Sequence, residues 1–406
     1  MRLQRLAFVA ILLFSVPGIT LGETIEISPS DDWFSILSGD SLQPGDEVVL
    51  GSGIYSNSRR LVICHSGTLE EPVTIRAAAG ASVVFKRPDA KQNTINLEGN
   101  QHLRLIGLEI TGGAAGIRIS ARAGRQPSDL VLEGLHIHDI GGVAITCNHE
   151  GAKYRHMTFR GNHIHHTSGH GEAFYLGGNR GSAIISESVI ENNYIHDLNG
   201  VNVSQGDGIE IKQGSYGNRI VGNVIHDTKY PGITVYGTAD HARNVIENNW
   251  IWNTGDHGIQ AAADAIIRDN KIASVAGCGI YSREHQGAVP ANLRIEGNFV
   301  IGGTNPALRI IGGQTEQADA TIELVGNRLC ARNGFAIRID DHALVKGHQN
   351  RGTGKVAGRD HHTLDWSVDD SAKVGPLSEL KGHPLKGHPA WRSMDRHALR
   401  NLFVPR

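Results

Sequence analysis

One short pattern recurs through the middle of the chain: an apolar residue, two or three residues, an asparagine, one variable residue and a second apolar residue. Seven segments fit this pattern, and their shared asparagines recur at intervals of 21 to 31 residues. These asparagines are Asn162, Asn193, Asn223, Asn249, Asn270, Asn298 and Asn327. A repeat of this length cannot bury its apolar face alone and has to stack on its neighbours. The pattern therefore predicts a solenoid.

Each segment is followed by a turn and a second short run that alternates between apolar and polar residues, as in "GIEIKQ", "GITVYG" and "GIYSR". Strands of four or five residues that alternate inward and outward build one coil of an all-β solenoid. Asparagine and glycine supply left-handed backbone conformations at the corners, and stacked asparagines can bond one another along the column. The 51 glycines and the low aromatic content of 5% also fit a β structure with many turns.

The N-terminal region supports the same architecture. Its segments "LQPGDEVVLGSGIYS" and "SGTLEEPVTIRAAAGASVVF" resemble the opening coils of right-handed parallel β-helix proteins, the pectin-lyase-like superfamily. The resemblance covers roughly residues 24–345 and implies a single-stranded right-handed parallel β-helix. Because binding and structural proteins share this fold, function has to be argued from the site.

The two ends of the chain differ from the repeats. Residues 1–22 combine a basic start, an apolar run and a small-residue exit, which predicts a signal peptide and an exported, periplasmic or extracellular protein. We expect the β-helix over residues 23–345 and an irregular C-terminal cap over residues 346–406, with Trp366 and Trp391 packed on the helix. No later stretch is apolar enough to span a membrane. The net charge of −2 gives no basis for binding nucleic acid.

Aligning the second strand of each coil on its first inward residue places polar residues in columns. The inward residues are Phe174, Ile209, Ile233, Ile259 and Ile280. The outward residues that follow them are Tyr175, Glu210, Thr234, Gln260 and Tyr281. Two positions further on lie Gly177, Lys212, Tyr236, Ala262 and Arg283. The incoming turns carry Glu172, Asp207, Pro231, His257 and Cys278.

These columns predict an acidic cluster. Stacked coils lie about 4.8 Å apart, so Glu172, Asp207 and Glu210 can converge from adjacent coils. Three carboxylates on one face repel one another unless a cation neutralises them, and Ca²⁺ is the cation that oxygen ligands favour. We therefore expect these three residues to be metal ligands.

Lys212 lies one outward step from Glu210, and Tyr236 is expected one coil above Lys212. Such a set suits β-elimination from a uronic acid polymer, in which a base removes the proton beside a carboxylate and a cation stabilises the resulting charge. Substrate contacts are expected from neighbours on the same face and from one loop arginine: Tyr175, His257, Arg283 and Arg243. The long loop "DLNGVNVSQGD" is expected to overhang this face.

Residues 206–236 resemble the chondroitinase B and alginate lyase group, in which an acidic strand ends in a lysine and the next coil carries an arginine. The resemblance implies metal-ligand roles for Asp207 and Glu210 and a base role for Lys212. This chain departs from the group because Lys212 is closer to Glu210 and because Tyr236 occupies the arginine position. The proton donor is expected to be Tyr236 or His170.

Histidines form two further rows. His136 and His163 are expected before one corner, and His138, His165, His196 and His226 after it, beside a row of aspartates. A structural hydrogen-bonding ladder, a transition-metal site and catalytic histidines are all compatible with this pattern.

The sequence thus favours a secreted or periplasmic lyase that cleaves an acidic polysaccharide by calcium-assisted β-elimination. A C5-epimerase would use similar parts, and a glycoside hydrolase would need two carboxylates, for which Asp207 and Glu210 are candidates. Arg122, Arg125 and Arg243 could hold anionic sugars or be ordinary solvated loop residues. A non-catalytic carbohydrate-binding protein with a polar outer face remains the alternative from another class.

Overall fold

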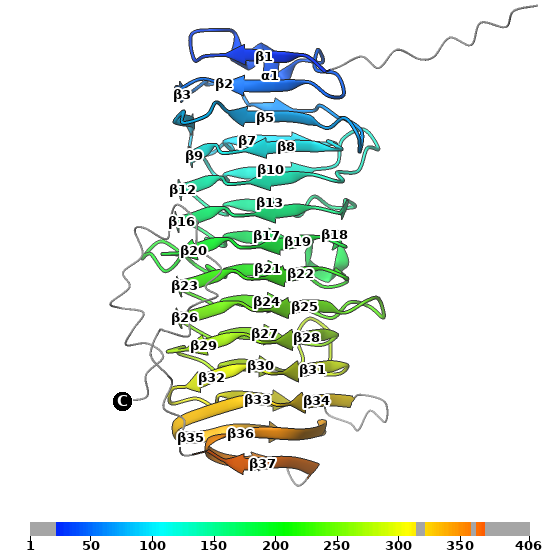
Figure 1. Cartoon of the computed structure of the whole chain (residues 1–406), viewed down its shortest axis with the longest axis vertical. Helices are drawn as coiled ribbons and strands as arrows, with labels where there is room; N and C mark the ends of the chain where they lie inside the picture. The colour runs from blue at the N-terminus through cyan, green and yellow to red at the C-terminus, as the bar shows by residue number, and fades with distance from the viewer. Residues whose placement is uncertain (1–21, 314–320, 359–362, 370–406) are drawn as a thin grey trace, which may run out of the picture.

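The computed structural model describes residues 22–313, 321–358 and 363–369, which form a parallel β-solenoid of about 12 coils. The coils stack along the long axis, from β1 at the N-terminal end to β37 at the other (Figure 1). The predicted all-β fold is therefore confirmed. Residues 1–21 of the predicted signal peptide and Trp391 lie outside the described residues.

Parallel pairing between successive coils builds three sheets. The first sheet contains β1 (Thr24–Ile27), β2 (Glu47–Leu50), β5 (Val73–Ala77), β8 (Leu103–Ile106), β11 (Val131–Glu133), β15 (Thr158–Arg160), β19 (Val189–Glu191), β22 (Arg219–Val221), β25 (Asn244–Glu247), β28 (Ala265–Arg268), β31 (Leu293–Glu296), β34 (Thr321–Val325) and β36 (Leu344–Gly358). The second contains β3 (Gly53–Tyr55), β6 (Val83–Arg87), β9 (Glu109–Gly112), β12 (His136–Ile140), β16 (His163–Thr167), β20 (Tyr194–His196), β23 (Val224–Thr228), β26 (Trp250–Thr254), β29 (Lys271–Ala273), β32 (Phe299–Gly302) and β35 (Arg328–Asp340). The third contains β4 (Val62–Ile63), β7 (Ile95–Glu98), β10 (Ile117–Ser120), β13 (Ile145–Cys147), β17 (Phe174–Leu176), β21 (Ile209–Ile211), β24 (Ile233–Val235), β27 (Ile259–Ala261), β30 (Ile280–Ser282) and β33 (Leu308–Ile311), and the end of β35 pairs with β33.

The remaining elements lie at the ends and in the loops. The helix α1 (Trp33–Ser38) buries Trp33, Phe34 and Leu37 against the core at the N-terminal end and so closes it. A small separate sheet pairs β14 (Lys153–Arg155) with β18 (Ile184–Ser186), and the 3₁₀ turn η1 (Asn179–Gly181) lies in the loop after β17. No helix of the described residues is long and apolar enough to cross a membrane.

The β-helix continues past residue 345, where the sequence predicts that it ends. Strand β36 pairs in parallel with β34 and β35, and β37 (Leu364–Val368) pairs in parallel with β36. Trp366 of β37 is half-buried and packs against the core.

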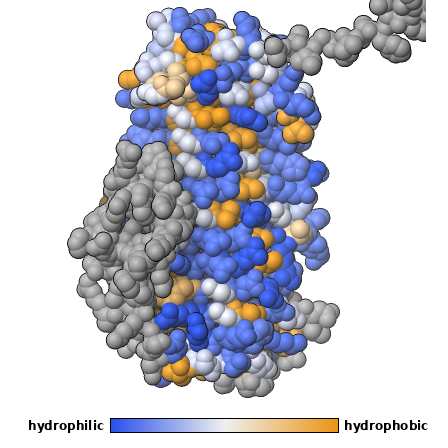
Figure 2. All heavy atoms as spheres, in the orientation of Figure 1, coloured by the Kyte–Doolittle hydropathy of each residue, from blue (hydrophilic) through white to orange (hydrophobic). Residues whose placement is uncertain are grey.

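The core is a stack of inward aliphatic side chains, and residues such as Ile209, Ile233 and Ile259 are fully buried. Gly208 precedes Ile209 because no side chain fits there: a Cβ atom would lie 2.4 Å from the carbonyl oxygen of Gly232 in the next coil. Outward positions carry polar residues together with apolar ones such as Trp250 and Ile266, and Figure 2 shows a mostly hydrophilic face with hydrophobic residues in scattered groups.

The predicted asparagine column is confirmed as a continuous buried ladder. Each asparagine from Asn162 to Asn327 donates its side-chain Nδ2 to the Oδ1 of the next asparagine, and Asn350 extends the column by one more coil. The left-handed corner residue is the one before the asparagine, as at Asn192 (φ 55°) and Gly222 (φ 65°). The turn and the ladder are therefore supplied by two adjacent residues.

Candidate functional site

The third sheet aligns the outward residues in the register that the sequence predicts. Tyr175 of β17 pairs with Glu210 of β21, Glu210 with Thr234 of β24, and Thr234 with Gln260 of β27. Tyr281 of β30 continues the column. The columns form because successive coils repeat one strand register, and they bring residues from distant parts of the chain to a single face.

Three acidic residues meet on this face. Carboxylate oxygens of Glu172, Asp207 and Glu210 lie within 4.8 Å of one another, and all three residues are buried. Both carboxylate oxygens of Glu172 and the Oε2 atom of Glu210 have no hydrogen-bond partner. Burying a carboxylate without a partner is costly. The cluster is therefore incomplete without protons or a cation.

The electrostatics of the cluster reflect this arrangement. Burial, followed by repulsion from Glu210, raises the pKa of Asp207 well above its usual range, although a hydrogen bond from Thr234 Oγ1 to Asp207 Oδ1 (2.7 Å) acts in the opposite direction. Burial is also the main cause of the raised pKa of Glu172. Both carboxyl groups therefore hold protons more tightly than exposed acids do.

The donor set fits a hard divalent cation. Ca²⁺ binds carboxylate and other oxygen ligands with flexible geometry, and its charge would offset the repulsion that raises these pKa values. The unpartnered oxygens of Glu172 and Glu210 supply ligand atoms that accept no hydrogen bond from any described residue. A calcium ion is thus chemically compatible with these three residues.

Lys212 and Tyr236 adjoin the cluster. The Nζ atom of Lys212 pairs with Glu210 Oε1 and lies 4.4 Å from the ring centre of Tyr175 and 5.2 Å from that of Tyr236. The hydroxyl of Tyr236 donates to the same Glu210 oxygen at 2.8 Å. Burial and the nearby Glu210 raise the pKa of Tyr236 strongly, so its hydroxyl stays protonated. An amine and a protonated hydroxyl therefore share one carboxylate oxygen.

His285 is a member of this group that the sequence did not indicate. Its Nε2 atom lies 3.2 Å from the Tyr236 hydroxyl, and burial, followed by the charge of Arg283, lowers its pKa. It belongs to the loop between β30 and β31, where Gln286 Nε2 donates to Asn179 Oδ1 at 3.4 Å. The sequence feature that could have indicated His285 is the length of this loop, which directly follows a strand predicted to carry site residues.

His170 lies at the opposite edge of the cluster. Its Nδ1 atom is 3.9 Å from Glu172 Oε1, and its side chain is 67% exposed. The predicted overhanging loop packs against this segment, with Ser204 N donating to Gly169 O at 2.6 Å and Gly206 N to His170 O at 2.8 Å. The loop therefore borders the site on the side of His170.

The expected substrate-binding residues differ in position. His257 accepts a hydrogen bond from Cys278 N at 2.8 Å, and its ring is tilted by 33° to that of Tyr281, with ring centres 4.0 Å apart. Arg283 is exposed and lies 5.9 Å from the Tyr281 ring. Arg243 is half-buried just before β25 of the first sheet and makes no hydrogen bond or ion pair with any described residue. Tyr175 and His285 thus line the cluster, whereas the structure does not bring Arg243 to it.

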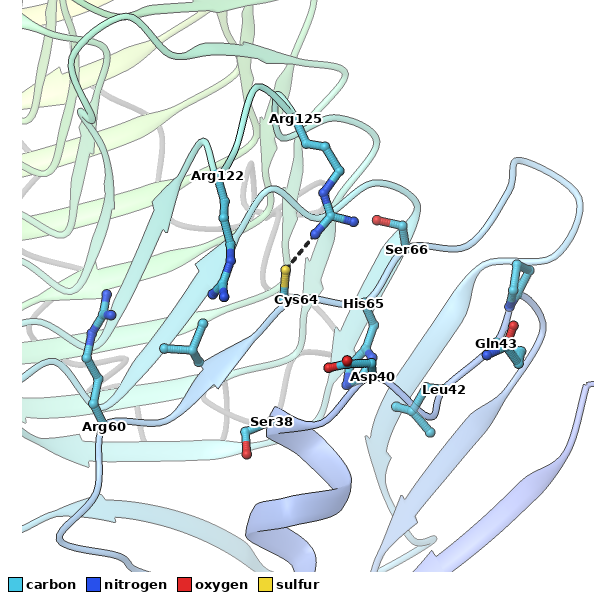
Figure 3. Close-up of a pocket in the computed structure, with 12 residues that line it drawn as sticks. Ser38, Asp40, Leu42, Gln43, Arg60, Cys64, His65, Ser66, Arg122 and Arg125 are labelled. Carbon is cyan, nitrogen blue, oxygen red and sulfur yellow. Dashed lines mark hydrogen bonds between the residues drawn. The ribbon is translucent and has the colours of Figure 1, made fainter.

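Arginines also lie in loops that flank the third sheet nearer the N-terminal end. A cavity of about 700 Å³ beside β4 is lined by Arg60, Arg122 and Arg125 together with Cys64 (Figure 3). Arg125 Nη2 donates to Cys64 Sγ at 2.7 Å, whereas Arg60 and Arg122 pair with Glu98. Two of the loop arginines considered for anionic sugars therefore face a cavity.

Comparison with known proteins agrees with the fold. Residues 156–329 match the family model described as the right handed beta helix region. No curated protein sequence matches the chain.

Three solved structures show the same architecture at low sequence identity. XylC in complex with xylose is 10% identical with a TM-score of 0.60, and the alignment covers 88% of each chain. A mannuronic acid specific polysaccharide family 6 lyase from human gut microbiota is 14% identical with a TM-score of 0.54, covering 90% of this chain and 94% of that chain. A GH136 lacto-N-biosidase from Eubacterium ramulus is 13% identical with a TM-score of 0.53, covering 86% of this chain and 68% of that chain. The matched region and the shared architecture show that the chain has the right-handed parallel β-helix fold.

Proposed function

We propose that the protein is a polysaccharide lyase that cleaves an acidic, uronic acid-containing polymer by calcium-assisted β-elimination on the third sheet. The observation that carries this proposal is the buried group of three carboxylates beside Lys212 and Tyr236. A merely solvated polar face would not bury acidic side chains with unpartnered oxygens.

Glu172, Asp207 and Glu210 would hold the calcium ion. When bound, calcium supplies positive charge beside the substrate carboxylate and so stabilises the charge that develops during elimination. The ion would also compete with Lys212 and Tyr236 for Glu210, whose Oε1 atom contacts both side chains in this structure. Lys212 and Tyr236 would then be free to turn toward substrate.

Lys212 would act as the base that accepts the proton from the carbon beside the uronate carboxylate. Tyr236 would donate its hydroxyl proton to the oxygen of the leaving sugar, since burial keeps that hydroxyl protonated. After release of the leaving sugar, His285, in contact with the same hydroxyl, would relay a proton from solvent to Tyr236, and Lys212 would lose to solvent the proton it had accepted. His170 is the alternative acid from the exposed edge.

Arginines flank the cluster along the sheet, which suits a linear anionic ligand. Arg118 of β10 occupies the outward column three coils before Glu210, and Arg309 of β33 occupies it four coils after Glu210. With coils about 4.8 Å apart, these distances are about 14 Å and about 19 Å, so a polymer of several sugars could reach both. One lyase among the structural neighbours is described as mannuronic acid specific, which makes mannuronate polymers a first substrate to test.

The test is the ultraviolet absorbance of the unsaturated uronide formed from alginate, pectate and glycosaminoglycans, with calcium and with chelator. We expect one polymer to give a signal that requires calcium. Lys212→Ala should abolish it, whereas Lys271→Ala, which alters a lysine on the second sheet, should not.

Other outcomes would redirect the assignment. Release of reducing ends without ultraviolet absorbance would indicate a glycoside hydrolase, and inversion of uronate residues without chain cleavage would indicate a C5-epimerase. Binding of a polymer without any chemical change would leave a carbohydrate-binding protein. An unchanged rate in Lys212→Ala would refute the base assignment.

A further inference from the structure

The outer face of the second sheet carries the predicted histidine rows. Both rows lie on the same strands, two residues apart, and not on opposite sides of the corner. In one row the rings of His138, His165, His196 and His226 stack with centres 5.0 to 5.2 Å apart and interplanar angles of 9° to 14°. In the other, His136 and His163 stack at 4.8 Å. The repeat therefore fixes the position of each ring.

Ring nitrogens connect the two rows diagonally. The Nε2 atoms of His136 and His165 are 2.8 Å apart, as are those of His163 and His196. Two Nε2 atoms at this distance share a single proton, since one ring must donate and the other accept. Each diagonal pair consequently contains a nitrogen lone pair directed at its partner.

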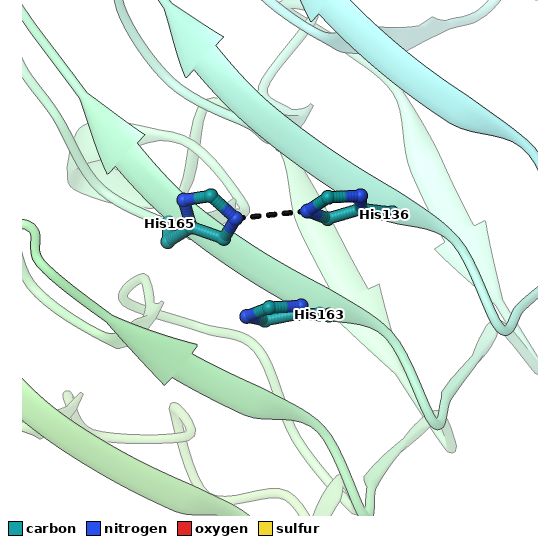
Figure 4. A group of neighbouring side chains, drawn as sticks. All are labelled: His136, His163 and His165. Carbon is teal, nitrogen blue, oxygen red and sulfur yellow. Dashed lines mark hydrogen bonds between the residues drawn. The ribbon is translucent and has the colours of Figure 1, made fainter. Parts of the chain in front are cut away.

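Three of these rings converge. His136 of β12 and His163 and His165 of β16 each offer one nitrogen, and these nitrogens lie within 4.8 Å of one another. Figure 4 shows His136 and His165 facing each other with His163 on the adjacent side. All three residues are half-buried, so their rings are held by packing but remain accessible from solvent.

We propose that His136, His163 and His165 bind a divalent transition-metal ion of the class that prefers imidazole, such as Cu²⁺, Ni²⁺ or Zn²⁺. Imidazole nitrogens suit these metals, and ligation takes place through neutral rings. Two nitrogens bound at about 2.0 Å and at right angles are about 2.8 Å apart, which matches the His136–His165 separation. The metal would lie to one side of the line that joins the two Nε2 atoms, and the proton shared between them would move to Nδ1 of the ring that carries it, so that both neutral rings are protonated at Nδ1.

The surroundings keep these rings ready to bind. Burial lowers the pKa of His136, and burial together with neighbouring histidines lowers that of His165 to about 3. The Nδ1 atom of His165 contacts His166 Nδ1 at 2.6 Å, which orients the ring as outer partners of metal-bound histidines do. On binding, the three rings would turn so that their lone pairs point at the ion instead of at a neighbouring ring.

A neighbouring group, Glu109 with His136 and His138, is a poorer candidate. His138 places Nδ1 2.8 Å from Asp139 Oδ2 and Nε2 3.3 Å from Glu109 Oε1. Both of its ring nitrogens thus already face carboxylates. The proposed site is also independent of the acidic cluster, which lies on another sheet and offers oxygen ligands.

The test uses the full-length chain without a histidine tag, stripped with chelator and kept in excess calcium. Isothermal titration with Cu²⁺, Ni²⁺ and Zn²⁺ alone should reveal one tight equivalent per chain for at least one metal. His165→Gln and His163→Gln should each weaken that binding by about tenfold or more. The matched control His226→Gln changes a ring of the same ladder outside the triad and should leave the affinity unchanged.

A spectroscopic measurement on the wild type avoids dependence on variant folding. The electron paramagnetic resonance spectrum of the Cu²⁺ complex should show coupling to several imidazole nitrogens. Absence of a one-equivalent site, a spectrum with only oxygen ligands, or equal affinity in His165→Gln and the wild type would each overturn the proposal.

Discussion

Removing one side chain from the asparagine ladder tests what holds the coils in register. Asn223 is fully buried, and its side chain takes part in four hydrogen bonds. Its Nδ2 donates to Ile190 O at 2.9 Å and to Asn249 Oδ1 at 3.0 Å. Its Oδ1 accepts from the backbone N and from Nδ2 of Asn193, at 3.0 and 2.9 Å. Alanine at this position would abolish all four.

The size of the effect follows from that count. A net contribution of about 1 kcal/mol for each hydrogen bond gives a loss of about 4 kcal/mol in the free energy of unfolding of Asn223→Ala. The backbone N–H of Asn193 and the carbonyl of Ile190 would also lose side-chain partners inside the core, which adds to the cost. The aliphatic core offers these groups no other hydrogen-bond partners, and water cannot reach them to replace the lost hydrogen bonds.

Urea denaturation followed by circular dichroism measures this loss, and hydrogen exchange shows whether protection falls first in the coils next to Asn223. The matched control is Asn305→Ala, which removes one exposed hydrogen bond, to Ala276 O at 2.7 Å. We expect less than about 1 kcal/mol for the control. A loss no greater than the control's in Asn223→Ala would refute the role assigned to the ladder.

In the presence of chelator, Glu172→Gln should raise the thermal unfolding midpoint, because a neutral amide replaces a buried carboxylate without partners. The same substitution should remove the stabilisation by calcium. An unchanged midpoint in chelator would contradict the cost assigned to burying this carboxylate. The calcium-free wild type should lose stability as pH rises above about 4, because the pKa values of Asp207 and Glu172 are higher in the folded than in the unfolded state. Urea denaturation at several pH values measures whether the free energy of unfolding falls as pH rises. We expect a smaller loss of stability in Glu172→Gln. Tyr236→Phe should lower kcat for elimination about 100-fold with little change in KM or folding, and full activity would exclude this hydroxyl as the acid.

The periodic part of the molecule could be predicted from the sequence. Asn162 and its equivalents mark each coil, and counting from the inward residues such as Ile209 gives the strand register. The same count places Glu172 and Asp207 at one position in successive coils. Repetition makes these inferences reliable because every coil repeats one arrangement.

The departures from the sequence-based expectation lie where the repeat is interrupted. His285 and Arg243 belong to loops, which the strand pattern does not place; the loop of His285 makes a contact between Gln286 and Asn179 of another coil. The sequence did not reveal that the β-helix extends beyond residue 345, because Gln349 and Asn350 form a corner within a strand that is rich in charged and polar residues. Burial of Lys212 likewise depends on flanking aromatic rings from two other coils.

The central claim is that the acidic cluster of the third sheet is a calcium-dependent elimination site. The most direct measurement is a crystal structure of Lys212→Ala with calcium and a uronate oligosaccharide, with the ion located by anomalous scattering. The expected result is one calcium ion with oxygens of Glu172, Asp207 and Glu210 at about 2.3 to 2.6 Å and a substrate carboxylate beside it. An oligosaccharide bound on the third sheet with no ion among these carboxylates, or a calcium ion bound elsewhere, would contradict the claim.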